Sequence, residues 1–480
     1  MKGRQQEIGL RSSSKGGGQG EARELPSRSV ELFMVKDARE SLGSEKLLEE
    51  VIEKGNIYRA LHGVMKNRGA PGVDGVTVEE LPQLLKDKWR AIEEQLLGAT
   101  YRPQPVRRVE IPKPDGGVRK LGIPTVMDRL LQQALLQVLQ RKYDPTFSPY
   151  SYGFRPGKNA HEAVAQAQSY IREGYAWVVD LDLEKFFDCV NHDRLMARLA
   201  SDIKDKRVLK LIRGYLQSGI MDEGLVSPTV LGTPQGGPLS PLLSNIVLDE
   251  LDQELTRRGH KFVRYADDEN IYVRSEAAGK RVMESVTKFI ARRLKLKVNE
   301  EKSAVARPSN RKFLGFTFTP KDKRRKVAPK ALKRFQEKVQ TLTRRTIGKS
   351  VEQVIQTLAP YLKGWKSYFG FAETTQDFKR LDSWIRRKLR CLIWKQWQTC
   401  STRYRELRKR GVKQYPAWVT AKSGHGPWRL SRSPAVQTAL SGSWFSSLGL
   451  PSLSVVSSQR QQPNRLVRTR MPGGVRGAAS

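Results

Sequence analysis

The chain has 480 residues, enough for two to four domains with a sizeable core. Lysine and arginine outnumber aspartate and glutamate by 87 to 49, which gives a formal net charge of +38. This excess is spread along the chain, so it indicates nucleic acid as the partner rather than a membrane patch. No apolar run approaches the roughly 18 residues of a membrane span, and the N-terminus lacks a signal-peptide core. Three cysteines without close pairing exclude a disulfide framework and a zinc site, and they suit a reducing cytosol.

The first hundred residues are predicted to be a tail followed by helices. Residues 1–42 are rich in Ser, Gly, Lys and Arg, and we expect a disordered basic tail, with a mitochondrial transit peptide as the alternative. Residues 43–104 show helical periodicity at 47–52 and 58–61, interrupted by a loop at 67–75 that is punctuated by Gly and Pro.

A β-hairpin is predicted at residues 106–124. Two alternating strands flank Asp115-Gly116-Gly117, and they carry Lys113 and Arg119. From the pattern alone, these cations are equally well explained as solvated charges at a strand edge. The helix that follows from Asp128 is predicted to pack in the core.

An apolar strand at residues 177–181 runs into carboxylates at its end. Asp180 and Asp182 are two residues apart, so their side chains share one face of the strand. Desolvating an unpaired carboxylate costs several kcal/mol, and a divalent metal is the simplest compensation.

A second acidic hairpin is predicted at residues 262–273, with Asp267 and Asp268 at its tip. An ordinary polar turn is the plain alternative. Carboxylates from two strands could instead hold two Mg²⁺ about 4 Å apart, the arrangement that phosphoryl transfer needs.

These two segments resemble a known family. The run YADD at 265–268, with VVDLDLEKFF at 178–187, resembles the palm of a reverse transcriptase. Blocks from about Asn67 to Trp397, and more loosely to Leu453, resemble a bacterial group II intron reverse transcriptase/maturase. The resemblance implies an α+β right-handed polymerase fold with fingers, a palm with an antiparallel sheet, and a helical thumb. The implied parts are an N-terminal extension (43–104), fingers and palm (105–320), a thumb or maturase domain (327–400), a small basic DNA-binding extension (401–453) and a disordered tail (454–480).

The resemblance also implies a catalytic site. Asp182, Asp267 and Asp268, with the backbone carbonyl of Leu183, would hold the two Mg²⁺. Asp182 is preferred to Asp180 because the metal-binding Asp of the family stands five residues before an aromatic, here Phe187, that contacts the sugar. That ring would exclude a 2′-hydroxyl, although plain core packing is the alternative. Further implied substrate contacts are Lys113 and Arg119 to the triphosphate, Gln235 to the templating base or nucleotide, and Lys302 to the departing pyrophosphate.

The segment 327–400 is helical, basic and rich in aromatic residues. A core of about three helices accounts for most of the aromatics. In the family, the outer face of this segment holds folded intron RNA, which implies RNA contacts by Lys363, Lys366, Arg386, Arg387 and Lys388. Beyond Glu406 the sequence has twelve Lys and Arg, no acid, one histidine and no cysteine, so the family's His-Asn-His endonuclease domain is expected to be absent.

We therefore expect an RNA-directed DNA polymerase in the bacterial cytoplasm. It would extend a primer on an RNA template with deoxynucleoside triphosphates, bind its intron RNA to promote splicing, and bind target DNA for mobility. The alternatives are a splicing cofactor with an idle polymerase, and a reverse transcriptase of retron or diversity-generating type. One departure is Glu269, which follows YADD where the family often has an apolar or small residue, and which would add a carboxylate beside the metals.

Overall fold

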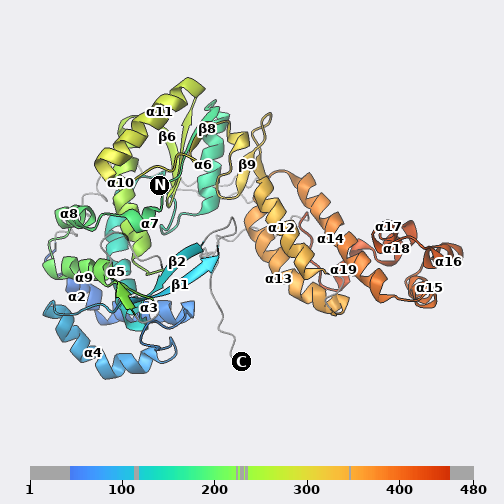
Figure 1. Ribbon diagram of the computed structural model, residues 1–480, viewed down its shortest axis with the longest axis horizontal. Helices are drawn as coiled ribbons and strands as arrows, with labels where there is room; N and C mark the ends of the chain where they lie inside the picture. Colours follow the sequence, from blue (N-terminus) through green and yellow to red (C-terminus); the bar gives the residue numbers. More distant parts are fainter. Residues whose placement is uncertain are drawn as a thin grey trace, which may run out of the picture.

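The computed structural model describes residues 44–112, 118–222, 225–227, 232, 236–344 and 348–454. The described chain has a sheet-containing part at one end and a purely helical part at the other (Figure 1). The predicted tails at 1–42 and 454–480 lie outside the described residues, apart from Ser454. Among the helices described, none combines the length and apolar character that crossing a bilayer requires.

Three helices open the described chain: α2 (Leu47–Ile52), α3 (Lys54–Asn67) and α4 (Leu81–Leu97). The Glu53 carboxylate accepts hydrogen bonds from the backbone N–H groups of Gly55 and Asn56, so it satisfies donors that the start of α3 leaves unpaired. The apolar faces of these helices pack on α5 (Val126–Tyr143), whose core residues are fully buried. The helices predicted at 47–52 and 58–61 are confirmed, and so is the core helix.

The hairpin predicted at 106–124 is confirmed as β1 (Val106–Pro112) and β2 (Val118–Ile123), an antiparallel pair. The hairpin belongs to a four-stranded sheet of order β2-β1-β4-β5, completed by β4 (Ile220–Asp222) and β5 (Leu225–Ser227). The short helices between this sheet and the next one are η1 (Asp144–Thr146), α7 (Phe186–Cys189), α8 (His192–Asp202) and α9 (Lys206–Gln217).

A second four-stranded sheet, of order β6-β7-β3-β8, holds both acidic segments. Its strands are β3 (Trp177–Leu181), β6 (Lys261–Tyr265), β7 (Asp268–Val273) and β8 (Ala304–Ala306), and every pair is antiparallel. Both faces are covered. Val179 and Ile271 pack in the core that includes α10 (Ser240–Arg257), whereas Val178 and Tyr272 pack in the core that includes α6 (Ala160–Arg172). This double burial explains why these strands are so apolar in sequence.

The remaining elements lead from this sheet to the thumb. α11 (Glu276–Phe289) contacts β3 and β8, and it continues into η2 (Ile290–Leu294). After η3 (Pro308–Asn310), the strands β9 (Phe316–Phe318) and β10 (Arg325–Val327) form a two-stranded antiparallel sheet.

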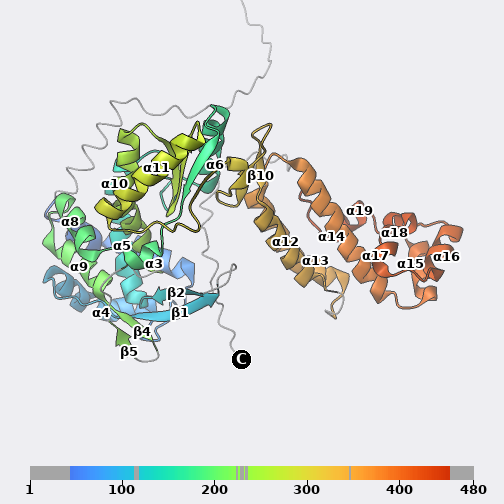
Figure 2. The same ribbon diagram turned by 45° about the horizontal axis from the view of Figure 1, so that its top comes forward.

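The C-terminal part is helical and extends away from the sheets (Figures 1 and 2). Its long helices are α12 (Pro329–Leu342), α13 (Val351–Phe369) and α14 (Thr375–Gln396), which bury Trp365 and Trp394. Beyond them, α15 (Cys400–Lys409), α16 (Gln414–Lys422), α17 (Pro427–Leu430), α18 (Pro434–Ala439) and α19 (Gly442–Ser447) share one core with α14. The aromatic residues of 327–400 thus serve mainly as core, as predicted.

Candidate active site

The acidic hairpin lies at the end of the central sheet. Tyr265 pairs with Asp268 across the turn, so the two-residue tip is Ala266-Asp267 and Asp268 is the first residue of β7. The prediction that both aspartates occupy the tip was therefore wrong by one residue. Ala266 has a φ of 59°, a left-handed conformation that is uncommon for a residue with a Cβ. The turn is held in this strained form by its surroundings.

Arg264 supplies much of that support, and the sequence analysis missed it. Its side chain is fully buried and forms a paired contact with Asp252 of α10, with N–O distances of 2.8 and 2.6 Å. The remaining guanidinium nitrogen donates to the side-chain oxygen of Asn245 and to the backbone oxygen of Ala266, both at 2.9 Å. Asn245 in turn donates to the backbone oxygen of Gly153, where an added Cβ would lie 2.2 Å from the Ala266 nitrogen. Helix, loop and turn are therefore locked together.

Asp182 stands immediately after β3, and the strand register brings it opposite Asp268. Leu181 pairs with Glu269, so the next residues along the two antiparallel strands face each other. The backbone N–H of Asp182 donates to the hydroxyl of Ser303, and its carbonyl accepts from the N–H of Asn299. The side chain of Lys302 lies 3.4 Å from the Asp182 carboxylate. Residues predicted as separate blocks of sequence thus meet at one place.

Electrostatic crowding is strongest at Asp268. Desolvation, followed by repulsion from Asp267, Asp180 and Asp182, raises the pKa of Asp268 to about 7. The Asp268 side chain nevertheless remains exposed to solvent at the start of β7. Asp180 is different because Arg311 donates to it at 2.7 Å. That ion pair occupies the Asp180 carboxylate, and the preference for Asp182 as the metal ligand stays a prediction.

The chemistry of these donors fits divalent metal. Three carboxylates and the carbonyl of Leu183 are hard oxygen donors of the kind that Mg²⁺ prefers. Mutual repulsion at Asp268 is a cost that a divalent cation would relieve. In the described part of the chain, however, no three His, Cys, Asp or Glu side chains lie ready to coordinate an ion together. The carboxylates would have to converge further, and Asp182 would have to exchange Lys302 for the metal.

Glu269 lies away from this site. Its side chain is buried, 4.0 Å from the Arg264 guanidinium, and neither carboxylate oxygen has a hydrogen-bond partner. Adjacent residues of a strand point to opposite faces, so Glu269 faces α10 while Asp268 faces the other acids. Burial, together with repulsion from Asp252, raises the pKa of Glu269 well above its usual range. The expectation of an extra carboxylate beside the metals was therefore wrong.

Phe187 is partly buried at the start of α7. Its ring meets that of Phe186 edge-on, with centroids 5.2 Å apart, and Phe186 is almost fully buried. An added Cβ on Gly232 would lie 2.8 Å from the Phe187 carbonyl oxygen, so Gly232 lies directly against α7. Phe187 thus keeps an accessible part, as a residue that contacts substrate requires.

Three predicted substrate contacts cannot be placed. Lys113 and Gln235 lie outside the described residues, and so does the side chain of Arg119, although its backbone belongs to β2. Their roles stay predictions.

The five cations predicted to bind RNA lie on α13 and α14, and two of them donate hydrogen bonds to backbone oxygens of the protein. Lys366 donates to the backbone oxygen of Ser452 at 2.8 Å. Arg387 donates to the backbone oxygen of Trp428 at 2.9 Å and lies 3.5 Å above that ring. Lys363 is exposed, and Arg386 and Lys388 are partly exposed. Lys363 is therefore the most accessible member of the set.

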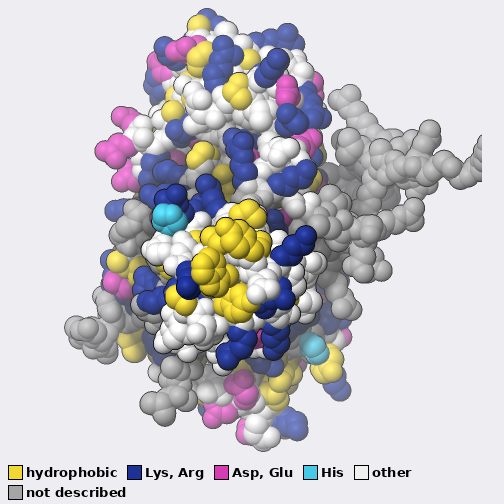
Figure 3. Space-filling model, turned by 90° about the vertical axis from the view of Figure 1, so that its right-hand side faces the viewer, with side chains coloured by type: hydrophobic (Ala, Val, Ile, Leu, Met, Phe, Trp, Pro, Cys, Tyr) yellow, Lys and Arg dark blue, Asp and Glu magenta, His cyan; other side chains and the backbone are white. Residues whose placement is uncertain are grey.

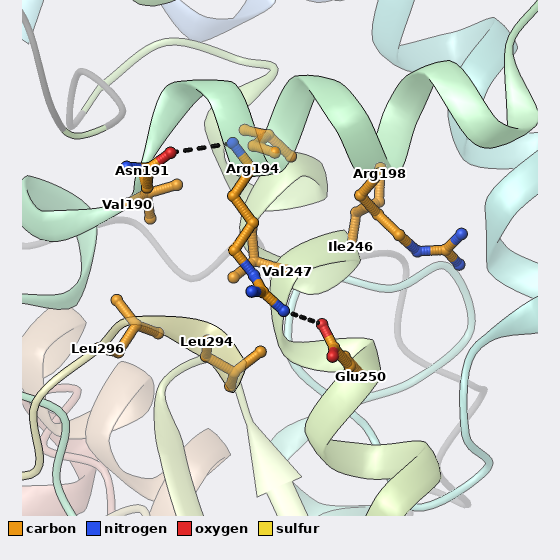
Figure 4. Close-up of a pocket in the computed structure, with 10 residues that line it drawn as sticks. Val190, Asn191, Arg194, Arg198, Ile246, Val247, Glu250, Leu294 and Leu296 are labelled. Atoms are coloured by element: carbon orange, nitrogen blue, oxygen red, sulfur yellow. Dashed lines mark hydrogen bonds and ion pairs between the residues drawn. The ribbon is translucent and has the colours of Figure 1, made fainter. Parts of the chain in front are cut away.

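Figure 4 shows a hollow in the sheet-containing part of the molecule. It lies between α8, α10 and Leu294–Leu296. Across it, the Arg194 guanidinium donates a 2.8 Å hydrogen bond to the Glu250 carboxylate. Its lining includes none of the predicted site residues.

Comparison with known proteins agrees with this geometry. Residues 111–318 match the family model described as reverse transcriptase (RNA-dependent DNA polymerase), and residues 332–411 match that of the group II intron maturase-specific domain. The first match contains the whole of the carboxylate site.

Individual relatives cover part of the chain. Protein YkfC of Escherichia coli (strain K12) is 37% identical over 224 residues, which are 45% of this chain and 59% of that protein. Group II intron-encoded protein LtrA of Lactococcus lactis subsp. cremoris is 32% identical over 283 residues, 58% of this chain and 46% of that protein. The chain thus spans about half the length of these curated relatives. A chain of a solved partial Cas6-RT-Cas1–Cas2 complex is 28% identical, with a TM-score of 0.33, and the match covers 51% of this chain and 42% of that chain. The chain is thus similar to group II intron-encoded proteins, through a stretch that matches the reverse transcriptase family followed by a stretch that matches the maturase-specific domain.

Proposed function

We propose that this chain is an RNA-directed DNA polymerase that uses two Mg²⁺, and that it also binds its intron RNA and promotes splicing. The observation that carries the polymerase is the meeting of Asp182 and Asp268 on paired strands, with Asp267 at the adjoining turn. Reverse transcriptase domains use divalent metal ions, and the mutual repulsion at Asp268 supports a site of that kind.

In the proposed reaction, the primer 3′ oxygen bonds to the α-phosphorus of a deoxynucleoside triphosphate, and the bond from that phosphorus to pyrophosphate breaks. The two Mg²⁺ would activate the attacking oxygen and stabilise the leaving one. Asp182, Asp267, Asp268 and the Leu183 carbonyl would hold the metals. Lys302 is near enough to Asp182 to reach the same substrate, and it would give a proton to the departing pyrophosphate.

Other residues would select and orient the substrates. Phe187 would pack beneath the sugar, where a 2′-hydroxyl has no room. Arg119, with Lys113, would pair with triphosphate oxygens, for which a guanidinium is well shaped. Gln235 would meet the templating base or the nucleotide.

Primer extension on an annealed RNA–DNA substrate tests the polymerase. Asp182→Ala or Asp267→Ala should lower the rate by several orders of magnitude, because in-line transfer loses its electrostatic stabilisation. RNA binding, measured on the same samples, should stay near that of the parent protein. Asp180→Asn is the matched control, since Asp180 is paired with Arg311, and it should lose far less activity. Extension by Asp182→Ala at the parent rate would overturn the site.

A role in splicing is the second proposed function, and the match of residues 332–411 to the maturase-specific domain favours it. The exposed cations of α13 and α14 offer a positive face to phosphate-rich, folded RNA. If the parent protein promotes splicing but does not extend a primer, the proposed splicing role stands and the proposed polymerase activity is overturned. The C-terminal region, 401–453, is proposed to bind target DNA.

A further inference from the structure

Helix α16 carries its large apolar side chains on the outside. Ala417 and Ala421 are buried against the neighbouring helices, whereas Tyr415, Trp418 and Val419 are 75%, 49% and 44% exposed. Positions 415, 418 and 419 are three and four residues apart, so they lie on one side of the helix. An amphipathic helix normally turns such a stripe to the core. Here small residues face the core, and the aromatic stripe faces solvent.

Trp428, on the next helix along the chain (α17), is 42% exposed as well, and we refer to Tyr415, Trp418, Val419 and Trp428 together as the α16 face. Of the eight large hydrophobic side chains that are exposed in the described part of the chain, four belong to it. Viewed from this end, the molecule shows a hydrophobic patch bordered by Lys and Arg (Figure 3). Trp428 is fixed in place because Arg387 lies 3.5 Å above its ring and donates to its backbone oxygen. A concentrated and fixed aromatic surface of this kind indicates a binding site.

The charge around the α16 face selects the partner. Residues 400–454 contain nine Lys and Arg and one acid, Glu406, which is bound to Arg410. Lys422 lies 4.5 Å from the Trp418 ring, and Lys388 lies 5.4 Å from the Trp428 ring. A second copy of this face would bring like charges together, which disfavours self-association. The cations would pair with the charges of a polyanion, and the exposed aromatic side chains would stack on flat rings that the same polyanion presents.

In duplex DNA the faces of the bases are stacked on one another, so a duplex would contact the cations through its phosphates and would not stack on the aromatic side chains. Unpaired bases use both, because they stack on aromatic side chains while their phosphates meet the cations. We propose that the α16 face binds an unpaired stretch of target DNA, with bases stacked on Tyr415 and Trp418. This rests on the proposed binding of target DNA by the C-terminal region, and it names the form of the DNA that is bound.

The test compares the whole protein with a Tyr415→Ala/Trp418→Ala variant. Binding of a labelled single-stranded DNA oligonucleotide, of the same DNA as a duplex, and of the matching RNA strand is measured by fluorescence anisotropy. Both positions are exposed, so the fold should survive. Stacking is worth about tenfold in affinity per base, so the variant should bind single-stranded DNA at least tenfold more weakly and the duplex within about twofold of the parent. Tyr58→Ala, an equally exposed aromatic on α3, is the matched control and should bind like the parent.

An equal loss on single-stranded and duplex DNA, or no loss at all, would overturn the proposal. So would a larger loss on the RNA strand, or a change in oligomeric state caused by the double substitution. Primer extension on an annealed substrate separates this proposal from the polymerase. The Tyr415→Ala/Trp418→Ala variant should extend at the parent rate, whereas Asp182→Ala should lose extension and keep the binding of single-stranded DNA. Extension by Asp182→Ala would overturn the polymerase site and leave the α16 face standing.

Discussion

The guanidinium of Arg264 donates a 2.9 Å hydrogen bond to the backbone oxygen of Ala266, at the tip of the hairpin that carries Asp267 and Asp268. The same guanidinium is anchored to α10 through Asp252. The turn contains an alanine at a φ of 59°, which is a costly conformation unless the surroundings impose it. Arg264 therefore fixes the position of the turn that carries the proposed catalytic carboxylates.

The first prediction concerns Arg264→Lys. An ammonium group cannot pair with two carboxylate oxygens and reach both Asn245 and Ala266. Loss of the hold on the turn should lower kcat of primer extension on the order of a hundredfold, because small misplacements of reacting groups are that costly. The Mg²⁺ concentration for half-maximal rate should rise, while KM for the primer–template should change little.

Arg194→Lys is the matched control. Arg194 also pairs with a carboxylate of α10, that of Glu250, but the pair does not contact the hairpin turn. This variant should keep both kcat and the Mg²⁺ dependence. If Arg264→Lys lowers the rate only in proportion to a smaller fraction of folded protein, and the Mg²⁺ dependence does not change, then Arg264 has a structural role alone.

Local pattern predicted the hairpins at 106–124 and 262–273 and the acids that end β3, because alternation and turn residues are properties of short segments. The hold of Arg264 on the turn was not predictable in this way. In the sequence it looks like a cation on a strand, and its burial depends on Asp252 and Asn245, which only the packing of α10 brings near. The same is true of Glu269, whose face depends on where β7 begins. On α16, periodicity predicts a buried stripe, whereas Ala417 and Ala421 occupy the core instead.

A second prediction concerns selection of the sugar. Phe187→Val should admit ribonucleotides far better than the parent enzyme, because removing the ring opens room for a 2′-hydroxyl. Phe186→Leu is the control, since Phe186 is buried and should affect stability alone. Single-nucleotide insertion with a deoxy and a ribo substrate gives the ratio. An unchanged ratio for Phe187→Val would assign Phe187 to the core.

A third prediction separates splicing from synthesis. Reversing charge at Lys363, Arg386 and Lys388 should weaken binding of intron RNA and lower the log–log salt slope by roughly one unit per lost phosphate contact. Arg387 is left intact because it holds Trp428, and its removal would disturb α17. Splicing should fall much more than extension on a short, unstructured template. Collapse of extension with splicing intact would mean that this face serves the polymerase.

A fourth prediction concerns the dependence of stability on pH. Burial, followed by repulsion from Asp252, raises the pKa of Asp249 on α10 to about 6, against 3.8 for a free side chain. The folded state then binds this proton more tightly than the unfolded state, so Asp249 lowers stability progressively as pH rises from about 4 to about 6. Asp249→Asn keeps an acceptor for Gln253 and removes the charge. It should raise the free energy of unfolding at pH 8 by up to about 3 kcal/mol, and by much less at pH 4.

Glu254→Gln on the same helix provides the opposite control. Hydrogen bonds from Arg257 and Arg258 lower the pKa of Glu254 to about 2, so its charge favours the folded state above the unfolded pKa and that contribution is lost as pH falls toward 2. Glu254→Gln should therefore lower stability at pH 8, by a small amount because ion pairs near the protein surface are screened by solvent. Urea denaturation of each variant at pH 4, 6 and 8 provides the measurement. A gain from Asp249→Asn that is the same at all three pH values would show that its effect comes from packing rather than from charge.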